Sequence, residues 1–513
     1  MNNKKPYLYA TISTLLLFLG YFCIFKIFPF GENTILRIDL NTQYINFYNY
    51  LNSAKNIFFS WQAGLGSGFF ITFSYYLSSP FNLLIFLFKP ENMYIYAQLA
   101  IVLKCILASC TFVFFLRNSY NYKKNDVIIF SMMYSFSAYV ICYSFNIMWL
   151  DALYMLPICL CLIDKEKLWK FSLALGFTLL FNFYTGFMVA FFSGLYFLYK
   201  KSFSIKNIFT ILLPILLSFG MSMILFLPTI LKLGNGMLFK FDLLNIKPES
   251  IPALTNIFFN NFLYYSNKYV PLVYTGMLTP ILFPLYFMNK NIFKKEKILT
   301  ISFLIFLLLP IISPFFNLLW HGFDTPNMFE FRYAFVITII LILIAFRTYV
   351  NREYIEKKHL FISFLIFASV IFLEVVCFSC QAILNRNPYT AVAICMVITT
   401  FIYFLLYLKP NKITNALLVL IIFIDLLVGA YNGQKSSFYS FLRIENYNKY
   451  DEIINTFMEE YLENPEIERI AFVNDEENER TYNLALTYGY SGQSFFSSGS
   501  NINHVEGMYK LRI

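Results

Sequence analysis

The sequence is built from long apolar runs that are separated by short segments rich in Lys and Arg. About 20 consecutive apolar residues are enough to cross the hydrocarbon core of a bilayer as a helix. The first run extends from Tyr7 to Phe28, which is too long for the apolar core of a signal peptide. The chain is 58% hydrophobic and 13% charged, whereas soluble domains are about 45–50% apolar and about 25% charged. The sequence therefore predicts an all-α polytopic membrane protein with an uncleaved first span.

Thirteen runs are candidates for membrane helices, some of them short or re-entrant. They cover residues 7–28, 94–116, 126–144, 151–163, 168–182, 184–199, 208–231, 271–288, 298–319, 332–350, 360–381, 390–408 and 413–431. If all thirteen are counted, the basic clusters fall on one side of the membrane, which is typical of cytoplasmic loops. The N-terminus is then cytoplasmic, and the tail after residue 431 is extracytoplasmic.

Residues 168–199 test this count, because they form one apolar stretch with basic residues at both ends. A single crossing would place the basic residues of its two flanks on opposite sides. The segment Asn182 to Gly186 contains polar and Gly residues, which favour a turn between two short helices. Irregular backbone at membrane depth is tolerated where it is buried in protein or lines a wet cavity, so we expect a substrate cavity in this region.

Two segments lie outside the predicted spans. The loop 29–93 is too long for a simple connection and includes an aromatic stretch over 69–88, which predicts helices lying at the outer interface. The tail 432–513 carries 13 acidic against 7 basic residues. Its runs IERIAFV and TYNLALTYGY favour β-strands. We expect a transmembrane domain over 1–431 and a partial, possibly incomplete, α/β extracytoplasmic segment over 432–513.

Charged residues at membrane depth are candidates for function, because burying them in lipid is expensive. Lys104 lies about ten residues, or ~15 Å, from the start of its predicted helix, close to the middle of the bilayer. We expect it to pair with an acid or with a lipid phosphate. Asp151 is a candidate partner for Lys104 and also a candidate ligand for sugar hydroxyls. Alternatively, it is an acid at a helix end with a purely structural role.

Three further residues lie near the predicted outer face. Asp39 is either a solvated loop carboxylate or, if held near low dielectric, a general base. His321 and Arg332 bracket a predicted outer loop. A guanidinium there is suited to bidentate binding of phosphate, although a lone interfacial Arg also serves as an anchor.

Other classes of site receive no support from the sequence. It has no GxxxxGK[ST] loop, no GxGxxG opening a helix and no HExxH, so ATP-driven transport, dinucleotide chemistry and zinc peptidase chemistry are disfavoured. The basic residues belong to membrane loops, which disfavours nucleic-acid binding. No tight cluster of carboxylates or His residues demands a metal.

Several segments, in order along the chain, resemble the YfhO-type bacterial membrane protein family. They are DLNTQYINFYNYL, WQAGLG, YYLSSPFNLLIFLF, YSFSAYVICYSFNIMWLDALYMLP, NFYTGFM and HGFDTPNMFEFRYAF, with a weaker likeness in SGQSFFSSGS. This resemblance implies a glycosyltransferase of the GT-C class in the bacterial cell membrane. Its donor would be an undecaprenyl-phosphate sugar, and its acceptor lipoteichoic acid or a related envelope polymer. Other proteins would supply and flip the donor, and no additional cofactor is implied.

The residue types are compatible with that chemistry. An acceptor hydroxyl needs a base, for which Asp39 is the candidate, and a departing lipid phosphate needs positive charge, for which Lys104, Arg332 and His321 are candidates. Trp61, Tyr75 and Tyr76 are candidates for stacking on a sugar, or else are interfacial anchors. The main alternative is a transporter or flippase of lipid-linked sugars or of envelope polymer precursors, which also needs short helices and intramembrane charges.

Overall fold

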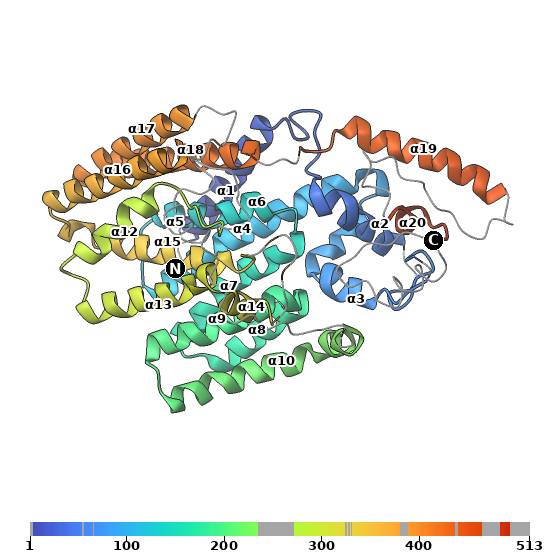
Figure 1. Ribbon diagram of the computed structural model, residues 1–513, viewed down its shortest axis with the longest axis horizontal. Coiled ribbons are helices and arrows are strands. Elements are labelled where there is room, and N and C mark those ends of the chain that lie inside the picture. Colours follow the sequence, from blue (N-terminus) through green and yellow to red (C-terminus); the bar gives the residue numbers. More distant parts are fainter. Residues whose placement is uncertain are drawn as a thin grey trace.

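The structure is a computed structural model that describes residues 4–53, 56–64, 66–233, 271–323, 326, 329, 331–379, 388–436, 440–463 and 483–492. Every regular element among these residues is helical, and the only extended pairings there are isolated bridges. Figure 1 shows long helices gathered into one bundle, with shorter elements at one end. The expected all-helical class is thus confirmed for this part of the chain.

The long helices follow the apolar runs closely. They are α1 (Lys5–Ile24), α4 (Met93–Ser119), α5 (Val127–Ser135), α6 (Ala138–Tyr143), α7 (Leu150–Asp164), α8 (Leu168–Phe181), α9 (Phe183–Lys201), α10 (Ile205–Leu233), α12 (Leu278–Met288), α13 (Lys294–Ile312), α14 (Pro314–Trp320), α15 (Ala334–Val350), α16 (Lys357–Ser379), α17 (Pro388–Tyr407) and α18 (Lys412–Ser436). Each of the thirteen predicted ranges overlaps at least one of these helices. Helix α18 continues a few residues beyond the expected boundary at residue 431.

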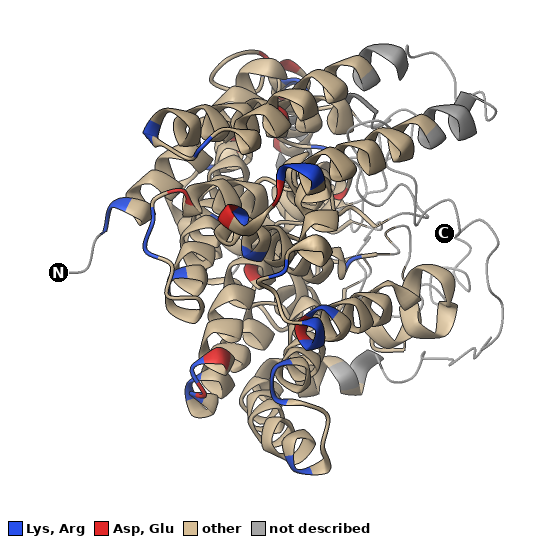
Figure 2. Ribbon diagram, turned by 90° about the vertical axis from the view of Figure 1, so that its left-hand side faces the viewer, with Lys and Arg blue, Asp and Glu red and all other residues tan. Residues whose placement is uncertain are grey.

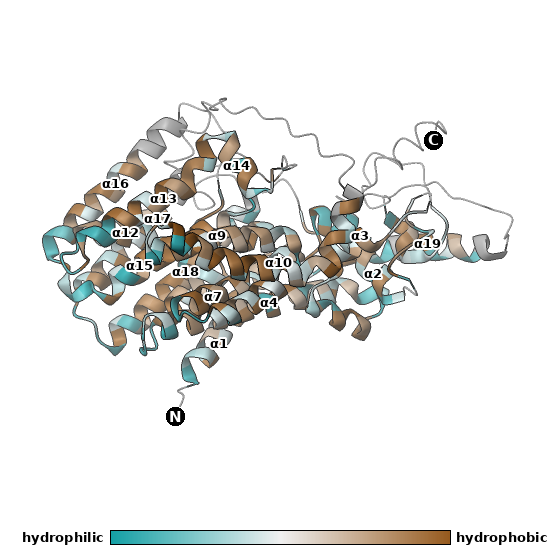
Figure 3. Cartoon of the chain, turned by 90° about the horizontal axis from the view of Figure 1, so that it is seen from below, coloured by the Kyte–Doolittle hydropathy of each residue, from teal (hydrophilic) through white to brown (hydrophobic). Residues whose placement is uncertain are grey.

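Five helical stretches are long and apolar enough to cross a membrane by themselves, judged over the described residues. They are Lys5–Ile24, Pro90–Ser119, Ile147–Asp164, Ile205–Thr229 and Lys412–Gln434, and two bent helix pairs raise the number to seven. The remaining apolar helices are shorter. Figure 3 shows that hydrophobic residues are concentrated along the bundle, with hydrophilic residues at helix ends. The count of thirteen crossings stays a prediction.

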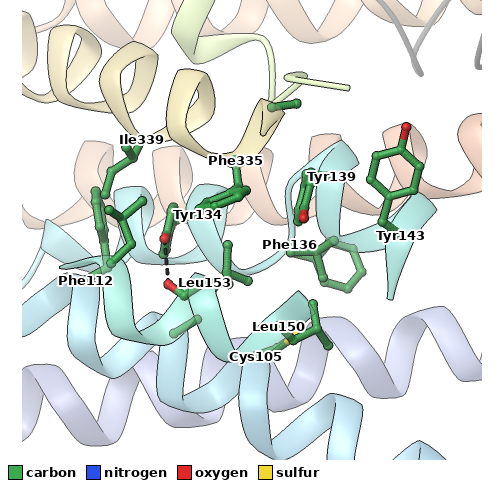
Figure 4. Packing of buried hydrophobic residues seen from close by; sticks show 14 of the residues in the cluster. Cys105, Phe112, Tyr134, Phe136, Tyr139, Tyr143, Leu150, Leu153, Phe335 and Ile339 are labelled. Carbon is green, nitrogen blue, oxygen red and sulfur yellow. Dashed lines mark hydrogen bonds between the residues drawn. The ribbon is translucent and has the colours of Figure 1, made fainter. Parts of the chain in front are cut away.

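Helix α4 lies in the core of the bundle, where it packs against α1, α5 and α7. The contacts are aromatic and aliphatic: the rings of Phe112 and Tyr134 stack with centroids 4.7 Å apart. The Tyr134 hydroxyl donates to the Leu153 carbonyl at 2.7 Å, as Figure 4 shows. A hydroxyl buried in this setting needs such a partner, so this bond fixes how α5 lies against α7.

Three breaks interrupt the helices where the sequence disfavours them. Asn182 is extended between α8 and α9, and its side chain accepts from the Thr185 N–H, so the predicted turn between two short helices is confirmed. Ser313 is extended before Pro314, and α13 and α14 meet there at 105°. Ser79 is extended before Pro80, at a bend of 99°. A residue that precedes proline avoids the helical region, which explains the last two bends.

Residues 29–93 form short helical elements, as expected, at one end of the bundle (Figure 1). They are η1 (Leu40–Tyr44), α2 (Ile45–Ser53), α3 (Phe70–Thr72), η2 (Phe73–Leu77), η3 (Pro80–Leu87) and η4 (Pro90–Asn92). Their expected position at the outer membrane interface stays a prediction, since the structure contains no membrane.

The tail differs from expectation. Its described part consists of two helices, α19 (Ile444–Glu463) and α20 (Leu484–Tyr488). The strand predicted over TYNLALTYGY is therefore wrong at Leu484–Tyr488, where Leu-Ala-Leu forms a helical turn that packs against α2. The run IERIAFV lies outside the described residues. The tail is also tied to the loop after α1, because the Thr34 N–H donates to the Leu442 carbonyl at 2.8 Å.

Ion pairs gather at the opposite end of the bundle, which we call the basic end and define by Lys200, Lys290, Arg347 and Arg352. Arg347 pairs with Glu296 at 2.9 Å, Lys290 with Glu356 at 2.8 Å, and Lys200 with Asp164 at 3.4 Å. Figure 2 looks onto this end and shows Lys and Arg at several helix ends, with acidic residues beside them. These loops are thus held by charges of both signs.

Candidate functional site

Asp39 lies between α1 and α2, directly before η1. Its Oδ1 accepts a hydrogen bond from Gln43 Nε2 at 3.1 Å, and its Oδ2 lies 3.3 Å from the Tyr44 hydroxyl. The preceding residue, Ile38, has a φ of 48°, in the left-handed region that a β-branched residue rarely adopts. Asp39 is half-buried. This carboxylate is therefore held by local contacts near the protein surface.

Tyr44 connects Asp39 to the segment before α7. Its hydroxyl lies 2.7 Å from Asn146 Oδ1, and its ring packs on Tyr76 with centroids 5.1 Å apart. The Asn146 side chain is buried, and its Nδ2 has no hydrogen-bond partner among the described residues. A buried amide donor without a partner is uncommon in folded proteins. It marks a polar position beside Asp39 that a water or a ligand can complete.

Arg332 lies just before α15 and faces aromatic rings. Its Nε donates to the Phe329 carbonyl at 3.1 Å, and one terminal nitrogen donates to the Tyr184 hydroxyl at 3.2 Å. Its guanidinium carbon lies 5.2 Å from the centroid of a Trp149 ring and 5.3 Å from that of Tyr184. Such rings stabilise a cation without neutralising it. Arg332 therefore presents a fixed positive charge.

Tyr75 joins these two parts. Its hydroxyl accepts from Trp149 Nε1 at 3.4 Å, and its ring packs against Tyr184 with centroids 6.1 Å apart. Tyr75 also packs against Tyr76, which packs against Tyr44. These contacts connect Asp39, the predicted general base, and Arg332, the predicted phosphate-binding cation, in one cluster. We call it the aromatic site and define it by Asp39, Tyr44, Tyr75, Trp149, Tyr184 and Arg332.

Three helices run from the aromatic site to the basic end. Trp149 precedes α7, Tyr184 begins α9 and Arg332 precedes α15. The C-terminal ends of the same helices carry Asp164, Lys200 and Arg347. These helices contain 15, 19 and 17 residues, or ~22, ~28 and ~25 Å at 1.5 Å per residue. The two ends therefore lie roughly a membrane thickness apart.

His321 lies at the C-terminal end of α14, with its ring 6.2 Å from that of Tyr184. Its Nδ1 lies 2.7 Å from the Asn317 carbonyl oxygen. Burial, and secondarily the charge of Arg332, lower the pKa of His321 to about 4. The imidazole is therefore neutral at pH 7. Burial thus disfavours the expected positive charge of His321 toward a phosphate, and the part of His321 in substrate binding stays a prediction.

Lys104 and Asp151 form an ion pair, which is one of the roles predicted for them. Their Nζ and Oδ2 atoms lie 2.8 Å apart, and both side chains are fully buried. Lys104 also donates to the Ile147 carbonyl, and Asp151 Oδ1 accepts from Ser79 and Tyr154. This network links α4, α7 and the bend before η3. Because both side chains are fully buried, the pair stabilises the start of α7 and is not accessible to a ligand.

The aromatic candidates separate into two groups. Tyr75 and Tyr76 lie in or beside the aromatic site, whereas Trp61 is 61% exposed and packs on Phe59 away from it. Sequence analysis did not single out Tyr44, Asn146, Trp149 or Tyr184. Each lies inside a segment that resembles the YfhO family, and this was the one sequence signal that could have identified them as candidates.

Asp425 lies inside the predicted span 413–431, and its contacts explain its presence there. Its two carboxylate oxygens accept from the Tyr274 hydroxyl and the Met277 N–H, each at 2.6 Å. Met277 directly precedes α12, so Asp425 of α18 caps the N-terminus of that helix. Glu374, an acid inside the predicted span 360–381, has a side chain outside the described residues. No group of three metal-ligating side chains occurs among the residues that could be searched.

Comparison with known families now identifies the chain. The model of the family "Bacterial membrane protein YfhO" matches residues 10–512. The chain belongs to the YfhO family. Together with its apolar helices, this makes it a multi-pass membrane protein.

Comparison with individual proteins adds little to the family assignment. This YfhO-family protein has a weak similarity to the crystal structure of ArnT from Cupriavidus metallidurans bound to undecaprenyl phosphate. The sequence identity is 10% and the TM-score 0.49, over 97% of this chain and 87% of that one. No curated protein matches it in sequence.

Proposed function

We propose that this YfhO-family protein is a glycosyltransferase that moves a sugar from an undecaprenyl-phosphate carrier to an envelope polymer such as lipoteichoic acid. The observation that carries the proposal is the aromatic site, in which Asp39 contacts Tyr44 and Arg332 contacts Tyr184. A base and a fixed cation are the two groups that this displacement requires. The resemblance of its motifs to the YfhO family, which implies the GT-C class, also supports the proposal.

Asp39 acts as the general base. The acceptor hydroxyl attacks the anomeric carbon of the donor, and its proton passes to the Asp39 carboxylate. Oδ1 accepts from Gln43, and Oδ2 lies beside the Tyr44 hydroxyl, so both oxygens have fixed positions. The local contacts thus fix the carboxylate while it remains half-exposed.

Arg332 stabilises the leaving group. When the bond between the anomeric carbon and the phosphate oxygen breaks, the electron pair remains on the polyprenyl phosphate. A guanidinium matches phosphate oxygens and stays charged at any relevant pH. The rings of Trp149 and Tyr184 hold it in place. Lys104 and Asp151 act indirectly, by fixing the start of α7, which Trp149 precedes.

The proposal includes an orientation in the bacterial cell membrane. The basic end faces the cytoplasm, following the positive-inside rule. The aromatic site and the tail then face outward, where envelope polymers are assembled. The donor reaches the site from the outer leaflet, so other proteins must supply and flip it. No metal or further cofactor is part of the proposed step.

The decisive experiment is reconstitution of the full chain into vesicles. Purified protein is given an undecaprenyl-phosphate sugar and polyglycerol phosphate, and transfer is measured as labelled polymer. The wild type should transfer sugar, whereas Asp39→Asn should fold normally and transfer almost none. Undiminished transfer by Asp39→Asn would remove Asp39 as the base. If neither protein transfers sugar and the wild type moves the lipid across the bilayer, the protein is a flippase.

A further inference from the structure

Helix α14 and His321, the residue that follows it, carry two buried hydrogen-bond acceptors without donors. One is His321 Nε2 and the other is Asn317 Oδ1, and neither has a partner among the described residues. Asn317 and His321 are four residues apart and are joined through the bond from the imidazole to the Asn317 carbonyl. Residues at this spacing share one face of a helix. Both acceptors therefore belong to the same end of α14.

The tautomer of His321 follows from its partner. A carbonyl oxygen can only accept, so Nδ1 carries the hydrogen and donates it to Asn317. Nε2 then carries a lone pair. The His321 side chain is only 2% exposed, so bulk water does not satisfy that lone pair. A buried acceptor without a donor is rare and favours the entry of a group that supplies one.

The surroundings decide what that group can be. His321 lies against Tyr184 and close to Arg332, the residue proposed to bind the lipid phosphate. A second anion gains nothing from Nε2, because the neutral imidazole offers it a lone pair and no proton. A hydroxyl, in contrast, donates to Nε2 or to Asn317 Oδ1. A ligand that carries hydroxyls within a few bonds of a phosphate satisfies Arg332 and these acceptors at once.

We propose that His321 Nε2 and Asn317 Oδ1 accept hydrogen bonds from hydroxyl groups of the sugar on the lipid-linked donor. This inference rests on the proposed function and extends it. It makes His321 a specificity-determining residue of the donor subsite, with no part in proton transfer. A site that accepts a substrate hydroxyl also rejects analogues that lack it, because its buried acceptors then stay unpaired.

The test compares a sugar-bearing lipid with the bare lipid. The full chain in nanodiscs is titrated with undecaprenyl phosphate and with undecaprenyl phosphate carrying glucose, galactose or N-acetylglucosamine. The wild type should bind one sugar-bearing lipid more tightly than the bare lipid. His321→Phe, which keeps the ring shape, should bind that lipid about tenfold more weakly, since one hydrogen bond is lost. It should bind undecaprenyl phosphate as the wild type does.

Two further variants separate this role from a structural one. His321→Gln can place a carbonyl oxygen near the position of Nε2 and should restore most of the preference for the sugar. Arg332→Gln should weaken binding of both lipids. Unchanged binding of undecaprenyl phosphate by His321→Phe serves as the control for folding.

The outcomes are distinct. If His321→Phe retains the preference, or if it loses affinity for both lipids equally, the subsite is overturned and the proposed function stands. The same holds if the wild type binds undecaprenyl phosphate but no sugar-bearing lipid more tightly. If the wild type binds neither kind of lipid, the proposed function is overturned, and the subsite with it.

Discussion

At the basic end of the bundle, basic side chains lie against carboxylates, whereas at the aromatic site the guanidinium of Arg332 lies against aromatic rings. Arg347 makes three hydrogen bonds to one carboxylate, that of Glu296. The guanidinium carbon of Arg332 lies 5.2 Å from the centroid of a Trp149 ring and 5.3 Å from that of Tyr184. Buried polar atoms without a hydrogen-bond partner among the described residues occur near both ends, for example Asn146 Nδ2 and, beside Arg352, Asp126 Oδ2. A carboxylate neutralises a cation, whereas rings stabilise it and leave its charge, so the aromatic site is the end better suited to bind an anion.

Removing the base should have the largest effect on activity. Asp39→Asn keeps the size of the side chain but cannot take the acceptor proton, so transfer should fall about 10³-fold. Initial rates of polymer labelling measure this loss. The matched control is Asp164→Asn at the basic end, which removes an acid that also binds a tyrosine hydroxyl. Equal losses in both variants would erase the distinction between the two ends.

Breaking the buried Lys104–Asp151 ion pair should strongly reduce the stability of the fold. Lys104→Met leaves the Asp151 carboxylate fully buried without its counter-charge, so the free energy of unfolding should fall by about 3–5 kcal/mol. Denaturant unfolding in detergent measures it. The double variant Lys104→Met/Asp151→Leu should recover much of the loss, because no uncompensated charge remains. A double variant as unstable as the single one would contradict this account.

Two arginines provide a direct comparison of the ends. Arg332→Gln removes the cation proposed for the leaving phosphate, so kcat for transfer should fall about 10²–10³-fold. Arg352→Gln removes a basic-end arginine that stacks on Tyr349 at 3.8 Å. It should leave kcat nearly unchanged. If Arg352→Gln reduced kcat as much as Arg332→Gln, the functional end would be wrongly assigned.

Lowering the pH should destabilise the protein through His321, which lies beside the aromatic site. Its pKa is about 4 in the folded protein, against an ordinary value of 6.5, because burial disfavours the charged form. The unfolded chain therefore binds the proton first as the pH falls. Stability from the neutral imidazole is complete above pH 6.5 and is lost between pH 6.5 and 4, by about 3 kcal/mol. Unfolding curves of the wild type should show this loss relative to His321→Gln. Parallel curves for the two proteins would refute it.

The smallest effect is expected at the basic end. Glu296→Gln breaks the pair with Arg347, whose side chains are 28% and 34% exposed. The free energy of unfolding should fall by about 1 kcal/mol, as for other partly exposed pairs, and transfer should not change. Thermal unfolding and transfer assays measure the two quantities. A large loss of transfer would show that the basic end takes part in the reaction.

Much of the helical framework could be predicted from the sequence, because hydropathy is a local property. The break at Asn182 was also predictable, since it depends on a short run of polar and Gly residues. The run TYNLALTYGY was misassigned because its Tyr and Thr residues favour strands, while contact with α2 favours the turn of α20. In this segment, tertiary packing overrides the local preference for a strand.

The site itself could be predicted only as separate residues. Asp39 and Arg332 were each identified by their chemistry, but nothing local indicates that the ring contacts of Tyr75 connect them. The neutral state of His321 depends on burial by segments distant in sequence. The same is true of Asn146, whose importance follows from its contact with Tyr44. Such relations arise from the packing of the helices.

The contact between α20 and α2 has a consequence for the order in which the protein matures. Asn46, on the element that follows Asp39, accepts a hydrogen bond from Thr487 at 2.6 Å, and the two residues are 441 positions apart. At a synthesis rate of about 5–20 residues per second, α2 leaves the ribosome roughly 20–90 seconds before its partner exists. During that time the contacts of α2 with the tail are missing. The surroundings of Asp39 are therefore completed only after Thr487 has been synthesised.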